Sequence, residues 1–263
     1  MSEENTEIQL PLDTSLGKLP QKEKGSLSPV ECKTMEELRR HQLERLAAGF
    51  RMFSHFGYDE GIAGHITLRD PEFPHYFWVN PFGMHFGQIC ISDLILVDRD
   101  GNIVQGEGKM LNTAAFAIHS RLHEARSDVN AAAHSHSMYG KSFSTLGRLL
   151  EPITQDSCAF YENHVLFDDF TGVVLETDEG DRIAKALGDK KAAILKNHGL
   201  LTTGESVDAA LWAFLSMDRC CQSQLIAESA GQMERIADDV AELTRDQVGS
   251  EFALSLIHIS EPT

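Results

Sequence analysis

Two histidines lie two residues apart in the stretch AAAHSHSMYG, where a run of small apolar residues meets a polar segment. In a β-strand, residues i and i+2 share a face with Cα atoms about 6.6 Å apart, so His134 and His136 could converge on one ion. A surface histidine beside a hydrogen-bonded core histidine would give the same pattern. The pair alone therefore leaves open both half of a metal site and a structural role.

A third histidine, His198, follows an apolar run in LKNHGLLTTG, and Gly199 beside it lets the backbone bend sharply. Three neutral imidazoles with a fourth position open are typical of catalytic zinc, which acts as a Lewis acid. We therefore take His134, His136 and His198 as candidate ligands of a divalent metal ion, with Zn²⁺ expected. Spacing alone does not establish that His198 meets the pair.

The elements that must position these histidines form a mixture of helical and strand patterns. Helical patterns cover residues 34–57, about 112–125, from about 138, 179–188 and from about 205. Strand patterns cover 65–70, 75–80, 94–98, 102–106, 129–136, 171–176 and 192–204, the last as two strands joined by a turn at Gly199. Because strict βαβ alternation is absent, we predict one α/β domain around a largely antiparallel sheet.

Three segments differ in composition. Residues 1–33 are polar, with scattered Pro, Gly and Ser, and are predicted to form a flexible arm. Residues 34–253 are predicted to form one domain. The tail LSLIHISEPT, residues 254–263, resembles the translated end of a sequencing adapter, so we expect it to be non-native and give its histidine no functional weight.

Charge and cysteine usage exclude several classes of function. The 40 acidic and 23 basic residues give a net charge of −17, which disfavours nucleic acid and anionic membranes as partners. No apolar run is long enough to span a membrane, and no signal-peptide pattern is visible. The five cysteines are odd in number and form no CxxC motif, which is typical of free thiols in the cytoplasm.

Four motifs then carry a resemblance to a known family: GIAGHITLRD, WVNPFGMHF, ARSDVNAAAHSHS and ILKNHGLLTTGESV. In order and spacing they resemble the class II aldolase/adducin family over residues 35–250. The resemblance implies that His134, His136 and His198 bind a divalent metal, usually zinc, which polarises a carbonyl and stabilises an enediolate. It also implies a three-layer α/β fold, with a central, largely antiparallel sheet flanked by helices. A homotetramer with sites near the subunit interfaces is implied as well.

The sequence departs from the sugar-phosphate aldolases of that family before the HxH strand. Asn112 stands where those enzymes carry an acidic proton shuttle, and Met110 and Leu111 replace serines that hold phosphate. An amide does not exchange protons at neutral pH, and apolar side chains do not solvate a dianion. We therefore expect sugar phosphates to be poor substrates. His65 replaces a phosphate-loop asparagine, and the resemblance implies a substrate-binding set of Gly64, His65, Asn80, Gly83 and Asn112.

Because Asn112 cannot transfer protons, we expect the acid–base residue to lie in another segment, TQDSCAFYENHVLF. In enzymes of the family this segment approaches the metal, and a neutral histidine is suited to proton transfer near pH 7. We expect His164 to be the shuttle, supported by Glu162 or Tyr161, with Asp156 as a further candidate. A solvated loop with a hydrogen-bonded histidine is the structural alternative.

Two further histidines, His119 and His123, are four residues apart in a helical pattern and are expected at the surface or at the edge of the core. Glu107 is a weaker acid–base candidate that fits a surface turn.

These features favour a cytoplasmic, metal-dependent lyase-like enzyme. It would catalyse aldol cleavage or decarboxylation, through a metal-stabilised enolate, on a small non-phosphorylated hydroxy- or oxo-carbonyl compound. The alternative is a non-catalytic, adducin-like protein that binds actin or other cytoskeletal partners. A retained metal site favours the enzyme.

Overall fold

The computed structural model describes residues 32–172 and 177–249. Most of the predicted arm at 1–33, most of the strand predicted at 171–176 and the predicted non-native tail at 254–263 lie outside the described residues. Residues 32–249 belong to one compact unit. None of the helices in the part of the chain that the structure describes has the length and apolar character needed to cross a bilayer.

A single sheet of eight strands organises the described residues, in the order β4-β3-β2-β1-β5-β8-β7-β6. Every neighbouring pair is antiparallel except β6 and β7, which are parallel. The predicted largely antiparallel central sheet is confirmed. The strands are β1 (His65–Arg69), β2 (Phe77–Val79), β3 (Ile95–Val97), β4 (Ile103–Gln105), β5 (Ala131–Ser135), β6 (His164–Phe167), β7 (Ala192–Leu195) and β8 (Gly199–Gly204).

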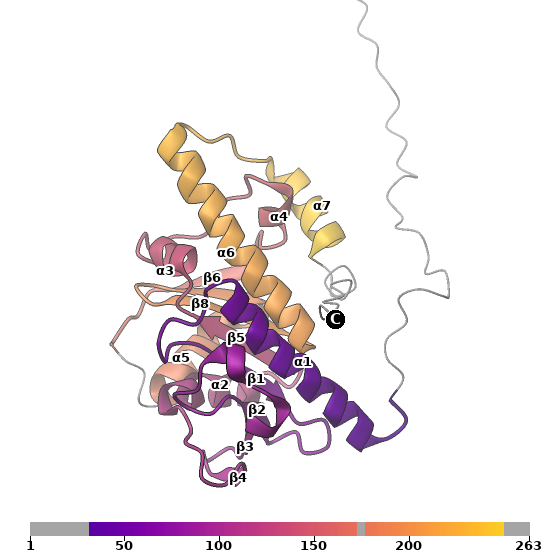
Figure 1. Ribbon diagram of the computed structural model, residues 1–263. Coiled ribbons are helices and arrows are strands. Elements are labelled where there is room, and N and C mark those ends of the chain that lie inside the picture. The colour runs from indigo at the N-terminus through magenta and orange to yellow at the C-terminus, as the bar shows by residue number, and fades with distance from the viewer. Residues whose placement is uncertain (1–31, 173–176, 250–263) are drawn as a thin grey trace, which may run out of the picture. The chain divides into compact units, whose positions relative to one another are not determined.

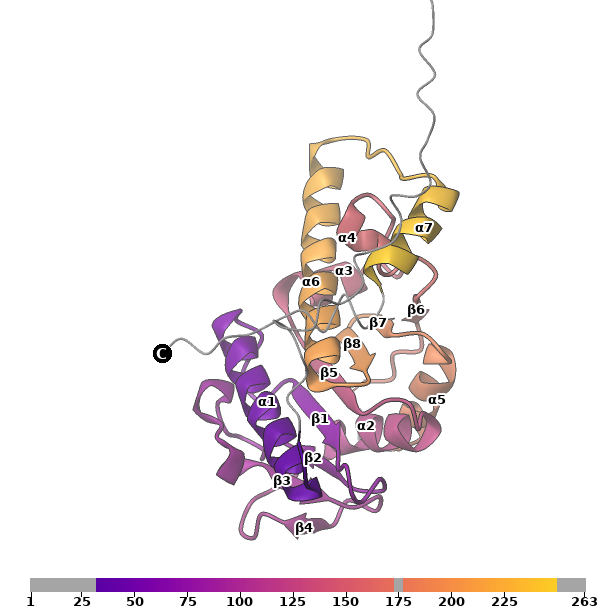
Figure 2. The same ribbon diagram turned by 90° about the vertical axis from the view of Figure 1, so that its right-hand side faces the viewer.

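Helices cover both faces of this sheet, so the domain has the three predicted layers. Helices α1 and α6 lie along one face, and α2 and α5 lie along the other (Figure 2). Near one end of α6, the short helix α4 packs beside α7 (Figure 1). The helices are α1 (Met35–His55), α2 (Thr113–Ala125), α3 (Met138–Ser144), α4 (Gln155–Cys158), α5 (Thr177–Leu187), α6 (Val207–Ala230) and α7 (Asp238–Val248), with two 3₁₀ turns, η2 (Phe86–Gln88) and η3 (Ile91–Asp93).

Strands β1 and β5 bury apolar side chains on one face and polar side chains on the other, because successive residues of a strand alternate. Ile66 and Leu68 belong to the core cluster shared with α1 and α6. His65 and Thr67 point to the opposite face, which α2 covers. His134 of β5 lies directly opposite His65 in the antiparallel register and therefore shares that face. The fold thus places buried polar side chains between the sheet and α2.

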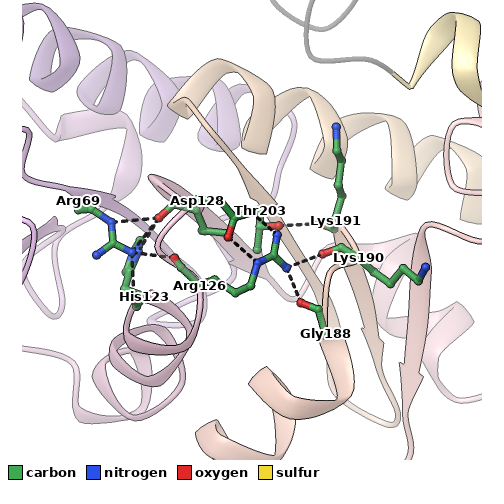
Figure 3. Close-up of polar contacts among 9 residues, drawn as sticks. Arg69, His123, Arg126, Asp128, Gly188, Lys190, Lys191 and Thr203 are labelled. Carbon is green, nitrogen blue, oxygen red and sulfur yellow. Dashed lines mark hydrogen bonds and ion pairs between the residues drawn. The ribbon is translucent and has the colours of Figure 1, made fainter.

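The side chain of Arg69 forms a clamp, by which we mean a set of hydrogen bonds that joins the end of α2 to the start of β5 (Figure 3). Its Nη2 atom donates to the backbone carbonyls of His123, Arg126 and Val129 at 2.7, 2.9 and 3.0 Å. Burial lowers the pKa of the Arg69 guanidinium, although an arginine stays charged at neutral pH. One side chain therefore satisfies three backbone groups that precede the strand carrying His134.

Arg126 extends this clamp to the loop between α5 and β7 (Figure 3). Its guanidinium forms a bidentate pair with Asp128 and donates to the backbone carbonyls of Gly188 and Lys190. These contacts lie at the start of β5, whereas His134 lies near its end. The arginine and aspartate of the ARSDV motif therefore have a structural role at the end of the strand remote from His134.

We expect Arg69→Leu to lower the free energy of unfolding by roughly 2–4 kcal/mol, because three backbone carbonyls each lose a hydrogen bond from the guanidinium. Urea unfolding measures this change. Arg40→Leu is the matched control, since the side chain of Arg40 is 78% exposed. A loss of stability no greater than that of the control would contradict the clamp.

Candidate metal centre

Three histidines meet at one end of the sheet. His134 is the second-to-last residue of strand β5, and His136 follows directly after β5. His198 ends the turn between β7 and β8. Because β5 and β8 are antiparallel, with Ser135 opposite Leu200, the end of one strand meets the beginning of the other. One ligand nitrogen from each of the three imidazoles lies within 4.8 Å of those of the other two. The structure therefore brings His198 to the HxH pair, which spacing alone did not establish.

The turn that carries His198 is built for close approach to β5. Asn197 has φ 58°, in the left-handed region that Asn tolerates better than most residues. A Cβ atom on Gly199 would lie 2.7 Å from the backbone oxygen of Ser135, so no other residue fits without a shift. The expected turn centred on Gly199 is displaced by one or two residues, and Gly199 instead begins β8.

The hydrogen bonding of His134 leaves its other nitrogen available to a metal. Its Nδ1 lies 2.8 Å from the backbone oxygen of Leu200, and a carbonyl only accepts, so Nδ1 carries the proton. Nε2 then has a free lone pair, the arrangement in which an outer partner fixes a metal-binding imidazole.

Burial keeps these imidazoles neutral at pH 7, as metal binding requires. It lowers the pKa of His134 well below its usual range, and it lowers the pKa of His198 to about 4, with the nearby imidazole of His136 as the second cause. His136 and His198 are only partly buried, so a ligand from solvent could reach the open side of the cluster. The donor set and its charge fit a divalent ion.

Three polar residues behind His134 were not recognised from the sequence. His119 and His123 of α2 are 0% and 5% exposed, so the expectation that they lie at the surface or core edge is wrong for His119 and fits His123 poorly. Both contact Thr67, and the His119 ring lies 4.2 Å from that of His65. The signal was the alternation His65-x-Thr67 on one strand facing a His-x-x-x-His helix.

Several expected substrate-binding residues also lie at this end of the sheet. Gly64 has φ 94°, and a Cβ there would lie 3.1 Å from the backbone oxygen of His134. The His65 and His134 rings are 5.1 Å apart. Asn80 is buried and directly follows β2, whose register with β1 directs it to the end where His65 begins β1. Gly83, at φ 80°, lies in the loop beyond.

Asn112 has a structural task at the beginning of α2. Its side-chain oxygen accepts from the backbone N–H of Ala114 at 3.1 Å, and its backbone oxygen accepts from Phe116 at 3.0 Å. These are the contacts of a helix N-cap, for which asparagine is among the preferred residues.

The structure does not bring His164 to the three histidines. It begins β6 opposite Ala192, at the end of β7 remote from His198. Its Nε2 accepts from the backbone N–H of Leu150 at 3.0 Å, and its Nδ1 donates to the backbone oxygen of Phe160 at 2.6 Å. Both nitrogens are therefore occupied, and burial lowers the pKa of the ring. This arrangement corresponds to the structural alternative and argues against a proton shuttle.

The other acid–base candidates do not belong to the cluster of three histidines that could hold a metal. Tyr161 forms a hydrogen bond with Asp238 of α7, and Glu162 lies 3.6 Å from Arg245 of the same helix. The remaining two are Asp156, which is exposed in α4 and lines a groove of about 370 Å³ with residues of α6, and Glu107, which is exposed in the loop before α2.

We expect His164→Ala to lower the free energy of unfolding by about 1–3 kcal/mol, because the buried N–H of Leu150 loses its acceptor. Metal content should not change, and turnover should stay within a few-fold of wild type once a substrate is known. Glu162→Gln, in the exposed neighbour, is the control. Loss of the metal, or a fall in turnover without loss of stability, would restore His164 to the site.

Comparison with known proteins agrees with this geometry. A family model described as the class II aldolase and adducin N-terminal domain matches residues 44–225. A protein named decarboxylase NovR, from Streptomyces niveus, is 47% identical over 226 residues, covering 85% of this chain and 83% of the relative. A protein from Streptomyces roseochromogenus subsp. oscitans, named 4-hydroxy-3-prenylphenylpyruvate oxygenase/4-hydroxy-3-prenylbenzoate synthase, is 47% identical over 225 residues, covering 85% and 81%.

Solved structures give the same assignment of the fold. A structure titled L-fuculose 1-phosphate aldolase from Glaciozyma antarctica superposes with a TM-score of 0.81 at 46% identity, and the match covers 87% of this chain and 90% of the other. The matched family segment includes all three clustered histidines and the strands that carry them. The chain therefore belongs to the class II aldolase and adducin N-terminal domain family.

Proposed function

We propose that the protein is a metal-dependent lyase that breaks a carbon–carbon bond beside a carbonyl group, by aldol cleavage or decarboxylation. Its substrate is a small hydroxy- or oxo-carbonyl compound without a phosphate group. The observation that carries this proposal is the cluster of His134, His136 and His198, whose ligand atoms lie within 4.8 Å of one another. A bound metal ion, for which three imidazoles suit Zn²⁺ best, would supply a Lewis acid for the carbonyl oxygen.

Different residues would bind the metal ion and contact the substrate. His134 is oriented by the Leu200 carbonyl and buried, so it would fix the position of a bound metal. His136 and His198 complete the ligand set from the more accessible side. His65 and Asn80 lie at the same end of the sheet and are the proposed polar contacts of the substrate. Gly64 allows the strand that carries His65 to approach β5.

The names of the relatives support a carbonyl substrate but differ on phosphate. One relative is named a decarboxylase and another by a phenylpyruvate, whereas the structural relative is named for a sugar phosphate. Three observations favour the non-phosphorylated class: Met110 and Leu111 are apolar, Asn112 caps α2, and Lys141, which acts on His136 electrostatically, is paired with Glu60.

The assembly and location that fit this function are a homotetramer in the cytoplasm. All five cysteines lie among the described residues and are free thiols, as a reducing compartment favours. A scaffold of the adducin type, binding actin, would not need three neutral imidazoles arranged around one point. The intact cluster therefore favours the enzyme over the scaffold.

We expect protein purified without chelator to carry about one divalent ion per chain. His136→Ala should lose most of this metal, because a ligand is removed, while the fold is kept, because the side chain is only partly buried. Elemental analysis and circular dichroism measure the two quantities, with the exposed His75→Ala as control. Wild-type protein that neither carries nor takes up a metal would refute the lyase.

The substrate class is tested with a matched panel on the zinc-loaded protein: 4-hydroxyphenylpyruvate, L-fuculose and L-fuculose 1-phosphate. We expect at least one of the two compounds without phosphate to be turned over about tenfold or more faster than the phosphate ester, because the site offers apolar side chains where a dianion would need donors. Faster cleavage of L-fuculose 1-phosphate would contradict the proposed class and favour a sugar-phosphate aldolase.

A further inference from the structure

A continuous set of polar side chains runs between the sheet and α2, behind the proposed metal ligands. It consists of His123, Thr67, His119 and His65, which we call the buried histidine row. The hydroxyl oxygen of Thr67 lies 2.9 Å from Nε2 of His123 and 2.6 Å from Nδ1 of His119. All four side chains are at most 5% exposed, so solvent does not satisfy their polar atoms.

If every imidazole of the row is neutral, only one assignment of donors and acceptors satisfies its hydrogen bonds. Nδ1 of His123 lies 3.3 Å from the backbone oxygen of Val129, which only accepts, so this nitrogen carries the proton. Nε2 of His123 is then bare and accepts from the Thr67 hydroxyl. Since that hydroxyl has a single proton, its oxygen accepts from Nδ1 of His119. His119 is therefore left with a bare Nε2.

The bare nitrogen of His119 needs a donor, and His65 is the imidazole beside it. Nε2 of His119 and both nitrogens of His65 are buried without a well-formed hydrogen bond, although the backbone of Gly64 acts weakly on the His65 ring. Such burial is costly inside a protein. The centroids of the two rings are 4.2 Å apart, and His65 is the remaining member of the row that can supply this donor. A neutral imidazole has one N–H, and the second nitrogen of His65 is then a bare acceptor.

That second nitrogen belongs to the proposed metal centre. The His65 ring is 5.1 Å from the ring of His134, and the two residues are paired across β1 and β5. Each of the three candidate ligands would use its free lone pair to bind the metal. None of them could then accept a hydrogen bond from a group bound to the metal. An acceptor beside the ion recognises an O–H group, which a water molecule or a hydroxyl of the substrate would bring.

We propose that His123, Thr67 and His119 fix the proton on His65 so that its remaining nitrogen accepts a hydrogen bond from an O–H group at the metal centre. His119 and Thr67 are positioning residues, because they act through His65. The acceptor role rests on the proposed function, since it requires the metal. The direction of the buried histidine row does not, and it is open to a separate measurement.

The test is long-range ¹H–¹⁵N spectroscopy of the full chain labelled in histidine, metal-free and zinc-loaded, at pH 7.5. We expect His119 and His123 to carry the proton on Nδ1, whereas free imidazole side chains prefer Nε2. Thr67→Val, which removes the hydroxyl and keeps the shape, should move the proton of His119 to Nε2, and Thr67→Ser should restore Nδ1. A wild-type His119 protonated on Nε2 would contradict the inferred direction of the row. A His119 tautomer that is unchanged in Thr67→Val would contradict it as well.

Hydroxyacetone and acetone then probe the acceptor role, because they differ by one hydroxyl. A shift of the bare His65 nitrogen on adding zinc alone identifies water as the donor, and a further shift with hydroxyacetone identifies the hydroxyl. In the second case hydroxyacetone should bind about tenfold tighter than acetone, and Thr67→Val should abolish the difference. If neither zinc nor hydroxyacetone shifts His65, the acceptor role is wrong.

The two proposals fail in different ways. Wild-type protein that takes up no zinc would refute the proposed function and, with it, the acceptor role of His65. The tautomers of His119 and His123 in that same metal-free protein would still decide whether the buried histidine row has the inferred direction. Zinc uptake with the wrong tautomers would refute the row alone.

Discussion

The antiparallel pairing of β5 with its two neighbours is the constraint on which the site depends. With β8 on one side, Ser135 lies opposite Leu200, so the end of β5 meets the turn that carries His198. With β1 on the other side, His134 lies opposite His65. A slip of one residue in either register would move these imidazoles to the other face of the sheet. Leu200, the β8 residue opposite Ser135, also supplies the carbonyl that orients His134. Strand register and ligand orientation are thus one feature.

Burial gives the cluster its chemistry. Desolvation is the largest cause of the lowered pKa of His65, His119 and His134, and the neighbouring imidazoles add to it because several positive charges cannot be held together. The side chains therefore remain neutral donors and acceptors at pH 7, with tautomers set by fixed partners. Small residues make this burial possible, since the alanines before His134 let helices pack closely on both faces of β5. The Arg69 and Arg126 clamp secures the other end of the same strand.

Much of the fold and part of the site follow from local patterns. Alternation and helical periodicity predict the layers, and His134 and His136 share a strand end. Their meeting with His198 depends on strand order, which is a long-range property that no local pattern encodes. The same limit applies to the residues that lie elsewhere than expected. The family resemblance implies that His164 approaches the metal, but the parallel pairing of β6 with β7 puts it at the end of β7 remote from His198. The helical pattern around His119 does not show which strand faces it, and in the fold that strand makes His119 a buried partner of Thr67.

The most direct test of this account is a crystal structure of protein purified without chelator, with X-ray data recorded on both sides of the absorption edge of the bound metal. The account predicts one anomalous peak per chain, coordinated by Nε2 of His134 and by one nitrogen each of His136 and His198, with a coordination position open to solvent. The absence of a peak in protein soaked with zinc, or a peak held by other residues while these three imidazoles stay unliganded, would contradict it.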